Sequence, residues 1–210
     1  MPLFKTITVN NNTKVLIWKI EEPLNFLLKE IDLTLKSRNR LESMKSEIHQ
    51  RGFLSVRLLL KEVGYSDSDL VYDEFGKPHL KDGKHISITH SYHFSGIIIS
   101  DKNPVGIDIE KQRDKIIRIA HKFTPITSDA YSKIKNTIEL IKKITIVWGA
   151  KESLYKIYGK KKLRFLEHIF ITDFTSDAKK TNGEISYNDK IAIFDVHFLE
   201  FEGFTCVFAY

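Results

Sequence analysis

Apolar and polar residues alternate at the start of the chain, and this alternation predicts a β-hairpin. Residues 3–9 and 14–20 carry it, and three asparagines at residues 10–12 separate the two runs. Asparagine tolerates the left-handed backbone of a tight turn. From residue 23 to about residue 63 the apolar positions recur every three or four residues, which predicts helix, and Gly64 is suited to end it. Short strands are predicted next, over residues 70–72, 85–89 and 96–100.

The second half of the chain has a similar mixed pattern. A strand is predicted over residues 105–109, followed by helix over about 115–122 and an interrupted helix over 128–158 that Gly159 would end. Further strands are predicted over residues 165–173, 184–187, 191–198 and 204–210, with turns at 182–183 and 188–189.

The order of these elements predicts an α+β fold made of two similar lobes. Both halves combine strands and helices in a related order, although no residue-level repeat connects them. We expect the lobes to cover residues 1–104 and 105–210. The chain has 210 residues, of which 42% are hydrophobic, so it is large enough to bury a substantial core.

The charge balance favours an anionic partner. Lys and Arg total 33 against 27 Asp and Glu, a net charge of +6 that is spread along the chain. Nucleic acid, an acidic protein and a phosphorylated small molecule all fit this excess. The single Cys206 cannot form an intrachain disulfide and the first residues do not resemble a signal peptide, so we expect a cytoplasmic protein. No apolar run approaches the roughly 20 residues that span a bilayer, so we expect no membrane association.

Two carboxylates lie close together at the end of the strand predicted from residue 105. Asp108 and Glu110 are two residues apart and therefore point to the same face. Carboxylates that close repel each other unless a cation lies between them. Mg²⁺ is the natural candidate, because it takes one or two carboxylates and leaves its other positions to water and phosphate oxygens. An isolated Asp-x-Glu pair, however, more often simply ends a strand on its solvent-exposed face.

A second candidate group lies on the long predicted helix of the second half. Glu152 and Lys156 are one turn apart on the same helix face. Alone, such a pair is usually a surface ion pair, and the nearby Trp148 is usually a core residue. In combination with Asp108 and Glu110, a third carboxylate and a cation would complete a site for Mg²⁺ and phosphate. Lys156 would then neutralise phosphate charge as a phosphate ester bond breaks.

Two segments of the first half are rich in residue types that bind phosphate. Gly76–Leu80 contains a turn that exposes Lys77, and Ser87–Ser91 places hydroxyl groups beside His90 at a strand end. A histidine with hydroxyl neighbours is more often a hydrogen-bonded loop residue than a ligand. Neither segment indicates a function by itself.

In this order and spacing, these motifs resemble those of the phosphopantetheinyl transferases, in particular the larger single-chain, pseudo-dimeric (Sfp-like) class that modifies acyl and peptidyl carrier proteins. Gly106–Glu110 is similar to that family's G-[IV]-D-[IVL]-E motif, and Trp148–Lys156 to its W-x-x-K-E-[SA]-x-x-K motif. Further similarities are Gly76–Leu80 to G-K-P-x-L, Ser87–Ser91 to N-x-S-H-S, and Arg51, Phe53, Leu54 and Arg57 to R-x-F-L-x-x-R. The resemblance covers most of residues 40–160.

Three residues depart from the family's motifs. Ser87 stands where the family often has Asn, and Thr89 where it has Ser, a change that keeps the hydroxyl group. Gly149 occupies a position that is usually Thr, Ser or Cys. Glycine is a poor helix former, so we expect a looser helical turn before Lys151.

The resemblance implies a fold and a reaction. Two α+β lobes would be related by a pseudo-twofold axis, with coenzyme A bound in the cleft between them. The protein would transfer phosphopantetheine from coenzyme A to a serine of an apo acyl or peptidyl carrier protein and release adenosine 3',5'-bisphosphate. Because both lobes belong to one chain, a monomer would be sufficient.

The resemblance also implies roles for individual residues. Asp108, Glu110 and Glu152 would hold Mg²⁺ against the pyrophosphate of coenzyme A. Lys156 would stabilise the departing adenosine bisphosphate. Glu152 would in addition act as the general base for the carrier-protein serine, directly or through a water. Residues of the first half would bind the phosphates of coenzyme A together with Lys156, namely Arg51, Lys77, Thr89 and His90.

A basic cluster, defined by Lys160, Lys161, Lys162 and Arg164, follows the helix that carries Glu152. Carrier proteins of this family's reaction are acidic around the modified serine, so a basic surface would steer them to the site. The alternative is a solvated loop whose cations favourably end a helix.

Two other functions compete with this interpretation. The basic charge and the 11% aromatic content would suit a nucleic-acid-binding module. Against that, the phenylalanines of the last third alternate like sheet core and no nucleic-acid motif is present, so we expect no nucleic-acid partner. The second alternative is a non-catalytic protein of the same fold that binds coenzyme A or a carrier protein. The presence of all three carboxylates and Lys156 favours the enzyme.

Overall fold

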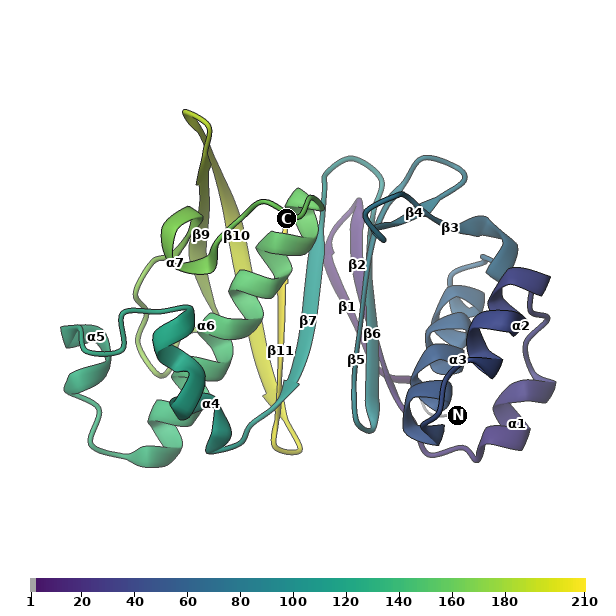
Figure 1. The fold of residues 1–210 in the computed structure, drawn as a ribbon, viewed down its shortest axis with the longest axis horizontal. Coiled ribbons are helices and arrows are strands. Elements are labelled where there is room, and N and C mark those ends of the chain that lie inside the picture. The colour runs from purple at the N-terminus through teal and green to yellow at the C-terminus, as the bar shows by residue number, and fades with distance from the viewer. Residues whose placement is uncertain (1–2) are drawn as a thin grey trace. The chain divides into compact units, whose positions relative to one another are not determined.

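The computed structural model describes residues 3–210. The chain divides into two compact units, Met1–Pro104 and Val105–Tyr210, which we call the N-terminal and C-terminal units (Figure 1). Each contains its own antiparallel sheet together with helices, which confirms the α+β class. None of the helices among residues 3–210 combines the length and hydropathy that crossing a membrane requires.

The N-terminal unit is built on a four-stranded antiparallel sheet with the strand order β1-β2-β6-β5. Its strands are β1 (Leu3–Asn10), β2 (Thr13–Lys19), β5 (His85–Ser91) and β6 (Phe94–Ser100). The predicted hairpin at the start of the chain is therefore confirmed. A separate two-stranded ribbon follows the short helix η1 (Asp67–Asp69) and pairs β3 (Leu70–Tyr72) with β4 (Pro78–Leu80).

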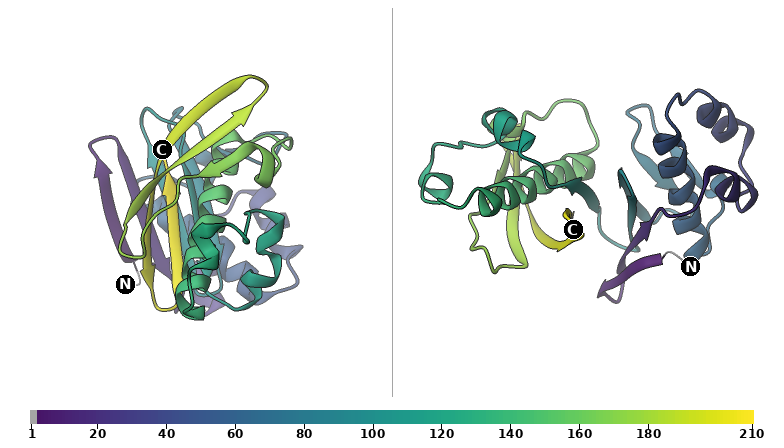
Figure 2. Two further views of the ribbon diagram at one scale, coloured as in Figure 1. Left: turned by 90° about the vertical axis from the view of Figure 1, so that its left-hand side faces the viewer. Right: turned by 90° about the horizontal axis from the view of Figure 1, so that it is seen from below.

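Three helices occupy the region in which the sequence predicted a helical pattern. They are α1 (Leu24–Lys29), α2 (Leu35–Glu42) and α3 (Glu47–Glu62), and α3 lies along the sheet (Figures 1 and 2). Residues 52–60 of α3 are buried without interruption, because the sheet covers one side of the helix and α1 another. Gly64 adopts a φ of 84°, which is easy for glycine and confirms the predicted helix end.

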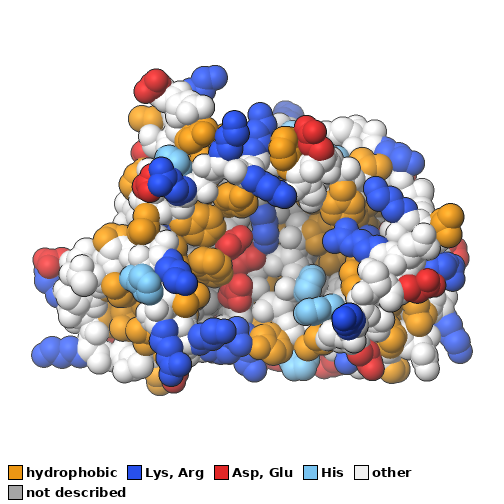
Figure 3. Space-filling model, viewed as in Figure 1, with side chains coloured by type: hydrophobic (Ala, Val, Ile, Leu, Met, Phe, Trp, Pro, Cys, Tyr) orange, Lys and Arg blue, Asp and Glu red, His pale blue; other side chains and the backbone are white. Residues whose placement is uncertain are grey.

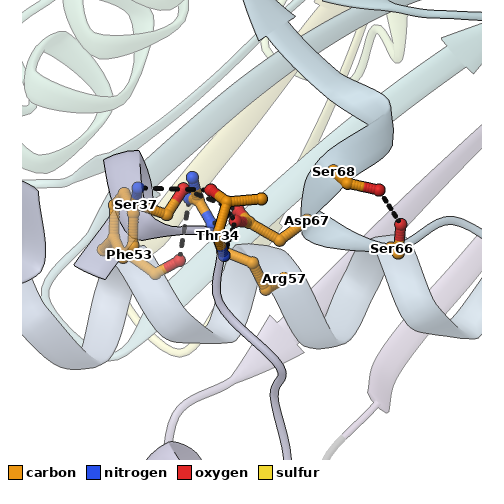
Figure 4. Close-up of polar contacts among 7 residues, drawn as sticks. All are labelled: Thr34, Ser37, Phe53, Arg57, Ser66, Asp67 and Ser68. Atoms are coloured by element: carbon orange, nitrogen blue, oxygen red, sulfur yellow. Dashed lines mark hydrogen bonds and ion pairs between the residues drawn. The ribbon is translucent and has the colours of Figure 1, made fainter.

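A buried ion pair ties the helices of the N-terminal unit together (Figure 4). Arg57 Nε on α3 donates to Asp67 Oδ1 at 2.9 Å, and the two side chains are only 3% and 1% exposed. Asp67 also accepts hydrogen bonds from the Thr34 N–H (2.9 Å), the Thr34 hydroxyl (2.8 Å) and the Ser37 hydroxyl (2.9 Å) at the start of α2. The Arg57 guanidinium lies 3.4 Å from the centre of the Phe53 ring. Every strong acceptor site of this carboxylate therefore faces a donor.

These donors determine how the stability of the unit responds to acid. Burial by itself raises the pKa of Asp67, but the hydrogen bonds from Thr34, Ser37 and Arg57 outweigh it and leave the pKa below its usual value. A carboxylate whose pKa is lower in the folded than in the unfolded state stabilises the fold at neutral pH. That contribution is lost as the pH falls through the unfolded value of about 3.9 towards the folded one.

We predict that Asp67→Asn lowers the free energy of unfolding by about 3–5 kcal/mol at pH 7, because it leaves the Arg57 charge buried without a partner. The difference from the parent protein should shrink as the pH falls below about 4, where Asp67 of the parent is protonated first in the unfolded state and only at lower pH in the folded state. Urea unfolding followed by circular dichroism at several pH values measures both effects. A difference that stays constant between pH 7 and pH 3 would contradict this account.

The C-terminal unit is built on a five-stranded antiparallel sheet with the order β7-β11-β10-β9-β8. Its strands are β7 (Gly106–Lys111), β8 (Ile169–Ile171), β9 (Lys180–Tyr187), β10 (Lys190–Phe201) and β11 (Phe204–Ala209). The long helix α6 (Thr137–Tyr158) crosses this sheet, as Figures 1 and 2 show. Smaller helices complete the unit, namely α4 (Lys115–Ile119), η2 (Ala120–Lys122), α5 (Asp129–Ser132) and α7 (Phe165–His168).

Helix α6 has a defined start and end. The Asn136 side chain accepts from the Ile138 N–H at 2.9 Å, which caps the first turn. Gly159 adopts a left-handed φ of 72° and its N–H donates to the Tyr155 carbonyl at 2.9 Å, as the sequence predicted. The helix continues without interruption through Gly149, so the expected loosening there does not occur.

Two further sequence predictions for this unit are wrong, both for reasons of packing. The turn predicted at residues 182–183 lies inside β9, where a Cβ on Gly183 would be 2.6 Å from Leu154 Cδ1 of α6. Glycine is present there to make room for the helix, whereas the predicted turn at residues 188–189 is confirmed by positive φ at both positions. The strand predicted over residues 165–173 begins only at residue 169, because α7 precedes it.

Candidate functional site

Two glycines bring helix α6 directly onto the sheet of the C-terminal unit. A Cβ on Gly106 of β7 would lie 1.9 Å from the Ser153 carbonyl oxygen, a distance that only glycine permits. On the helix side, a Cβ on Gly149 would lie 2.8 Å from Val207 Cγ2 of β11. The Ser153 hydroxyl donates to the Val207 carbonyl at 3.1 Å and fixes the same contact. Side chains on β7 and α6 can therefore meet at short range.

The first such meeting is an ion pair between the two elements. Lys156 Nζ on α6 lies 2.9 Å from Asp108 Oδ1 on β7 and also donates to the Ile107 carbonyl at 2.7 Å. The Asp108 side chain is only 9% exposed, whereas that of Lys156 is 29% exposed. A buried carboxylate needs a cation nearby, and Lys156 supplies it in this state of the protein.

Glu110 lies two residues further along β7 and contacts the same helix. Its Oε1 accepts a hydrogen bond from Trp148 Nε1 at 3.3 Å. The centre of the Trp148 ring lies 4.8 Å from that of Phe123 and 5.4 Å from that of Phe165. Burial raises the pKa of Glu110, and the negative charge of Asp108 raises it further. Trp148 is thus both a core residue and a donor to the candidate site.

Glu152 is the third carboxylate, and it projects from α6 one turn before Lys156. Burial raises its pKa to about 7, with further increases from the charges of Asp108 and Glu110 and a partly offsetting effect of Lys156. The three predicted metal ligands therefore lie close enough to influence one another electrostatically. Such mutual repulsion in a buried site is typical of functional carboxylates, which the surrounding fold must hold together.

The donor set of this site fits a hard divalent cation. Three carboxylates offer the oxygen ligands that Mg²⁺ prefers, and a dication would remove the repulsion that raises the pKa values of Glu110 and Glu152. Within residues 3–210, no three His, Cys, Asp or Glu side chains already stand in a metal-binding arrangement. Lys156 contacts Asp108 instead, so the carboxylates would have to adjust around the ion and Lys156 would have to yield its position.

A buried lysine that the sequence analysis gave no role anchors the same helix. Lys151 is 4% exposed, and its ammonium group donates to the carbonyls of Phe165 and Ile169. Burial lowers its pKa to about 8. These bonds tie α6 to α7 and β8. Only the adjacency of Lys151 to Glu152 could have pointed to this role in the sequence.

Four predicted phosphate-binding residues lie in the N-terminal unit. Arg51 on α3 donates from Nη2 to the Ile20 carbonyl at 3.0 Å. His90, on β5, packs on the same helix, where a Cβ on Gly52 would lie 3.2 Å from its ring. Thr89, its neighbour on the strand, is buried. The fold therefore brings Arg51 and His90 to one region of α3 and β5, whereas Thr89, as the preceding residue of the strand, points to the opposite face of the sheet.

Lys77, the fourth of these residues, lies in the turn between β3 and β4. Its N–H donates to Asp73 Oδ1 at 2.9 Å, which closes the turn. Burial lowers the pKa of its ammonium group, and the charge of Asp73 partly offsets this. A further histidine that the sequence analysis did not single out, His49 on α3, has its ring centre 6.1 Å from that of His90.

The basic cluster at residues 160–164 lies in the connection between α6 and α7. Its three lysines are exposed to solvent. Arg164 is engaged in an ion pair with Glu167, at 2.9 Å between Nη2 and Oε2. Lys and Arg side chains also occur elsewhere over the face seen in Figure 3, so this cluster is one of several basic regions.

We predict that Gly106→Ala destabilises the protein by about 1–3 kcal/mol or more, because the added methyl group would collide with the α6 backbone. Gly203→Ala is a matched control, since a Cβ there meets nothing within 4 Å and only its φ of 76° is unfavourable. Chemical denaturation of both variants measures the difference. Equal stability of the two would show that the close contact of β7 and α6 is not required.

Comparisons with known proteins relate the chain to one family. Residues 104–208 match the model of the 4'-phosphopantetheinyl transferase superfamily. The chain is 30% identical over 137 residues to 4'-phosphopantetheinyl transferase gsp of Aneurinibacillus migulanus and 28% identical over 149 residues to 4'-phosphopantetheinyl transferase ffp of Bacillus subtilis. It is 34% identical over 97 residues to 4'-phosphopantetheinyl transferase Sfp of Bacillus subtilis strain 168. These matches cover 64%, 67% and 45% of this chain, and 54%, 65% and 43% of the three relatives.

Proposed function

Because the chain belongs to the 4'-phosphopantetheinyl transferase superfamily and to its Sfp-like class, we propose that it transfers phosphopantetheine from coenzyme A to a serine of an apo acyl or peptidyl carrier protein. The observation that carries this proposal is the arrangement on β7 and α6. Two half-buried glutamates with raised pKa values, the buried Asp108 and a lysine converge there. Such a group suits a reaction in which charge develops on phosphate oxygens.

The proposed reaction is a displacement at phosphorus. The serine oxygen attacks the coenzyme A phosphorus atom that carries the pantetheine arm, and a new phosphorus–oxygen bond forms. The bond from that phosphorus to the bridging oxygen of the pyrophosphate breaks, and adenosine 3',5'-bisphosphate leaves. Asp108, Glu110 and Glu152 would hold Mg²⁺. When bound, this ion would neutralise negative charge on the pyrophosphate.

Glu152 is the residue that we propose as general base. Burial raises the pKa of Glu152 in the metal-free protein, which favours proton acceptance, whereas Mg²⁺ bound to the carboxylate would lower that pKa and make it a weaker base. The serine proton would pass to Glu152 either directly or through a water. The second route leaves the carboxylate free to serve as a metal ligand at the same time.

Lys156 is the residue that we propose to stabilise the leaving group. Its ammonium group lies at the surface end of the site, 29% exposed, and already neutralises one carboxylate. Once a cation takes over that carboxylate, the ammonium group is available to the negative charge that develops on the departing bisphosphate. Phosphates of coenzyme A would also be bound by residues of the N-terminal unit, namely Arg51, Lys77, Thr89 and His90.

The direct test is intact-mass spectrometry of an apo carrier protein after incubation with this protein, coenzyme A and Mg²⁺. We expect a mass gain of one phosphopantetheine, which should disappear with EDTA and with Asp108→Ala. Fatty-acid, polyketide and peptidyl carriers should each be assayed. No gain with any of them, while coenzyme A still binds, would favour the non-catalytic protein of the same fold.

We predict that Glu152→Gln lowers the transfer rate by about 100-fold or more, because the neutral amide can neither accept the serine proton nor offer the metal a negatively charged ligand. Glu139→Gln is a matched control on an exposed position of the same helix and should leave the rate unchanged. Initial rates from the mass assay at saturating coenzyme A measure both. A Glu152→Gln variant as active as the parent would refute the assignment.

We also predict that reversing charges in the basic cluster weakens carrier-protein recognition. Lys161→Glu with Lys162→Glu should raise KM for an acidic carrier protein about threefold to tenfold, because electrostatic steering is lost, and should leave KM for coenzyme A unchanged. Lys5→Glu with Lys14→Glu, at exposed positions of β1 and β2, is the control for the same change in net charge. An unchanged KM for the carrier protein would show that the cluster is only a solvated loop whose cations favourably end the helix.

A further inference from the structure

A cavity of about 880 Å³ lies in the N-terminal unit, where the end of β2 meets α1 and α3. Its lining combines apolar and charged residues. Trp18 and Leu58 are buried, and Phe26 on α1 is 49% exposed, so an apolar surface is available inside. The remaining lining residues are charged, namely Glu21, Glu22, Glu30, Lys61 and Glu62.

The charge of this cavity is opposite to that of the protein. Four carboxylates and one ammonium group line it, although the whole chain carries a net charge of +6. Lys61 lies 3.7 Å from Glu30 and also donates to its carbonyl, and Glu21 lies 3.4 Å from Lys19. Among residues 3–210, Glu22 and Glu62 take part in no ion pair. Two carboxylates of the cavity are therefore left without a cation.

Glu22 carries a further indication of a missing partner. Its Oε2 accepts a hydrogen bond from Trp18 Nε1 at 3.3 Å. Its Oε1 is buried and has no hydrogen-bond donor among the described residues. A buried carboxylate oxygen without a donor is costly, and proteins rarely retain one unless a ligand or water satisfies it. Because Oε1 is enclosed, the Glu22 side chain would have to turn towards the adjoining cavity to receive a donor from there.

We propose that this cavity binds a linear aliphatic diamine, with one ammonium group at Glu22 and the other at Glu62. The two carboxylates lie on different elements, Glu22 just after β2 and Glu62 at the end of α3, so two separate cationic groups are needed. The methylene chain between them would lie on Trp18 and Phe26, whose ring faces also attract ammonium groups. A divalent metal fits less well, because much of the lining is aromatic or aliphatic.

The binding test uses 1,5-diaminopentane as the probe in isothermal titration calorimetry at low ionic strength. Pentylamine, which has one ammonium group, and 1,5-pentanediol, which has none, are the matched ligands. We expect the diamine to bind at least about tenfold more tightly than pentylamine, and the diol not to bind, because each charge-assisted contact contributes separately. Absence of diamine binding, or equal affinity for diamine and monoamine, would overturn the proposal.

Variants place the ligand in this cavity rather than elsewhere on the surface. Glu22→Gln and Glu62→Gln should each weaken diamine binding about tenfold or more. Glu74→Gln, an exposed carboxylate of the same unit outside the cavity, should leave it unchanged. Lys61→Met should strengthen binding severalfold, because it removes the competing cation and releases Glu30.

The variants fail in distinguishable ways. If Glu22→Gln does not fold, Glu62 carries the same test, since its side chain is exposed to solvent. Parent-like affinity in the Glu62→Gln variant, or weaker binding in Lys61→Met, would show that the diamine does not occupy the cavity. Carrier-protein modification should proceed normally in all four variants, because none of these residues belongs to the proposed transfer site.

Discussion

The contact of helix α6 with strand β7 is the constraint on which the candidate site depends. Gly106 removes the side chain that would hold the two backbones apart, and Ser153 lies directly above it. At that separation Lys156 reaches Asp108, and Trp148 reaches Glu110. The glycine that begins the Asp-x-Glu motif is therefore as important as its carboxylates, because it sets the distance at which the helix presents Glu152.

The two units treat buried charge in different ways. In the N-terminal unit, Asp67 receives four donors, among them its buried partner Arg57, and its pKa is lowered. In the C-terminal unit, Glu110 and Glu152 are half-buried beside like charge, and their pKa values are raised. A carboxylate whose oxygens all accept hydrogen bonds stabilises the fold, whereas several carboxylates with too few donors and cations nearby favour the binding of a ligand. The cavity beside Glu22 belongs to the second kind.

Much of the fold followed from local pattern. The first hairpin, the end of α3 at Gly64, the cap at Gly159 and the turn at residues 188–189 are set by neighbouring residues, and each was predicted correctly. The errors at residues 165–168 and 182–183 share a cause. Both segments touch α6, through Lys151 and Leu154, and contacts between segments distant in the sequence leave no local pattern.

The sequence by itself indicated the family and predicted the residues of the candidate site, because its motifs are contiguous and the two most specific ones each lie on one element, β7 and α6. Only the tertiary structure decided what each side chain touches. It showed that Lys156 lies on Asp108, that Lys151 anchors the helix, and that Glu22 lines an acidic cavity in a basic protein. The physical reason is that burial and electrostatic coupling depend on distances between elements, and these distances are set by packing rather than by spacing along the chain.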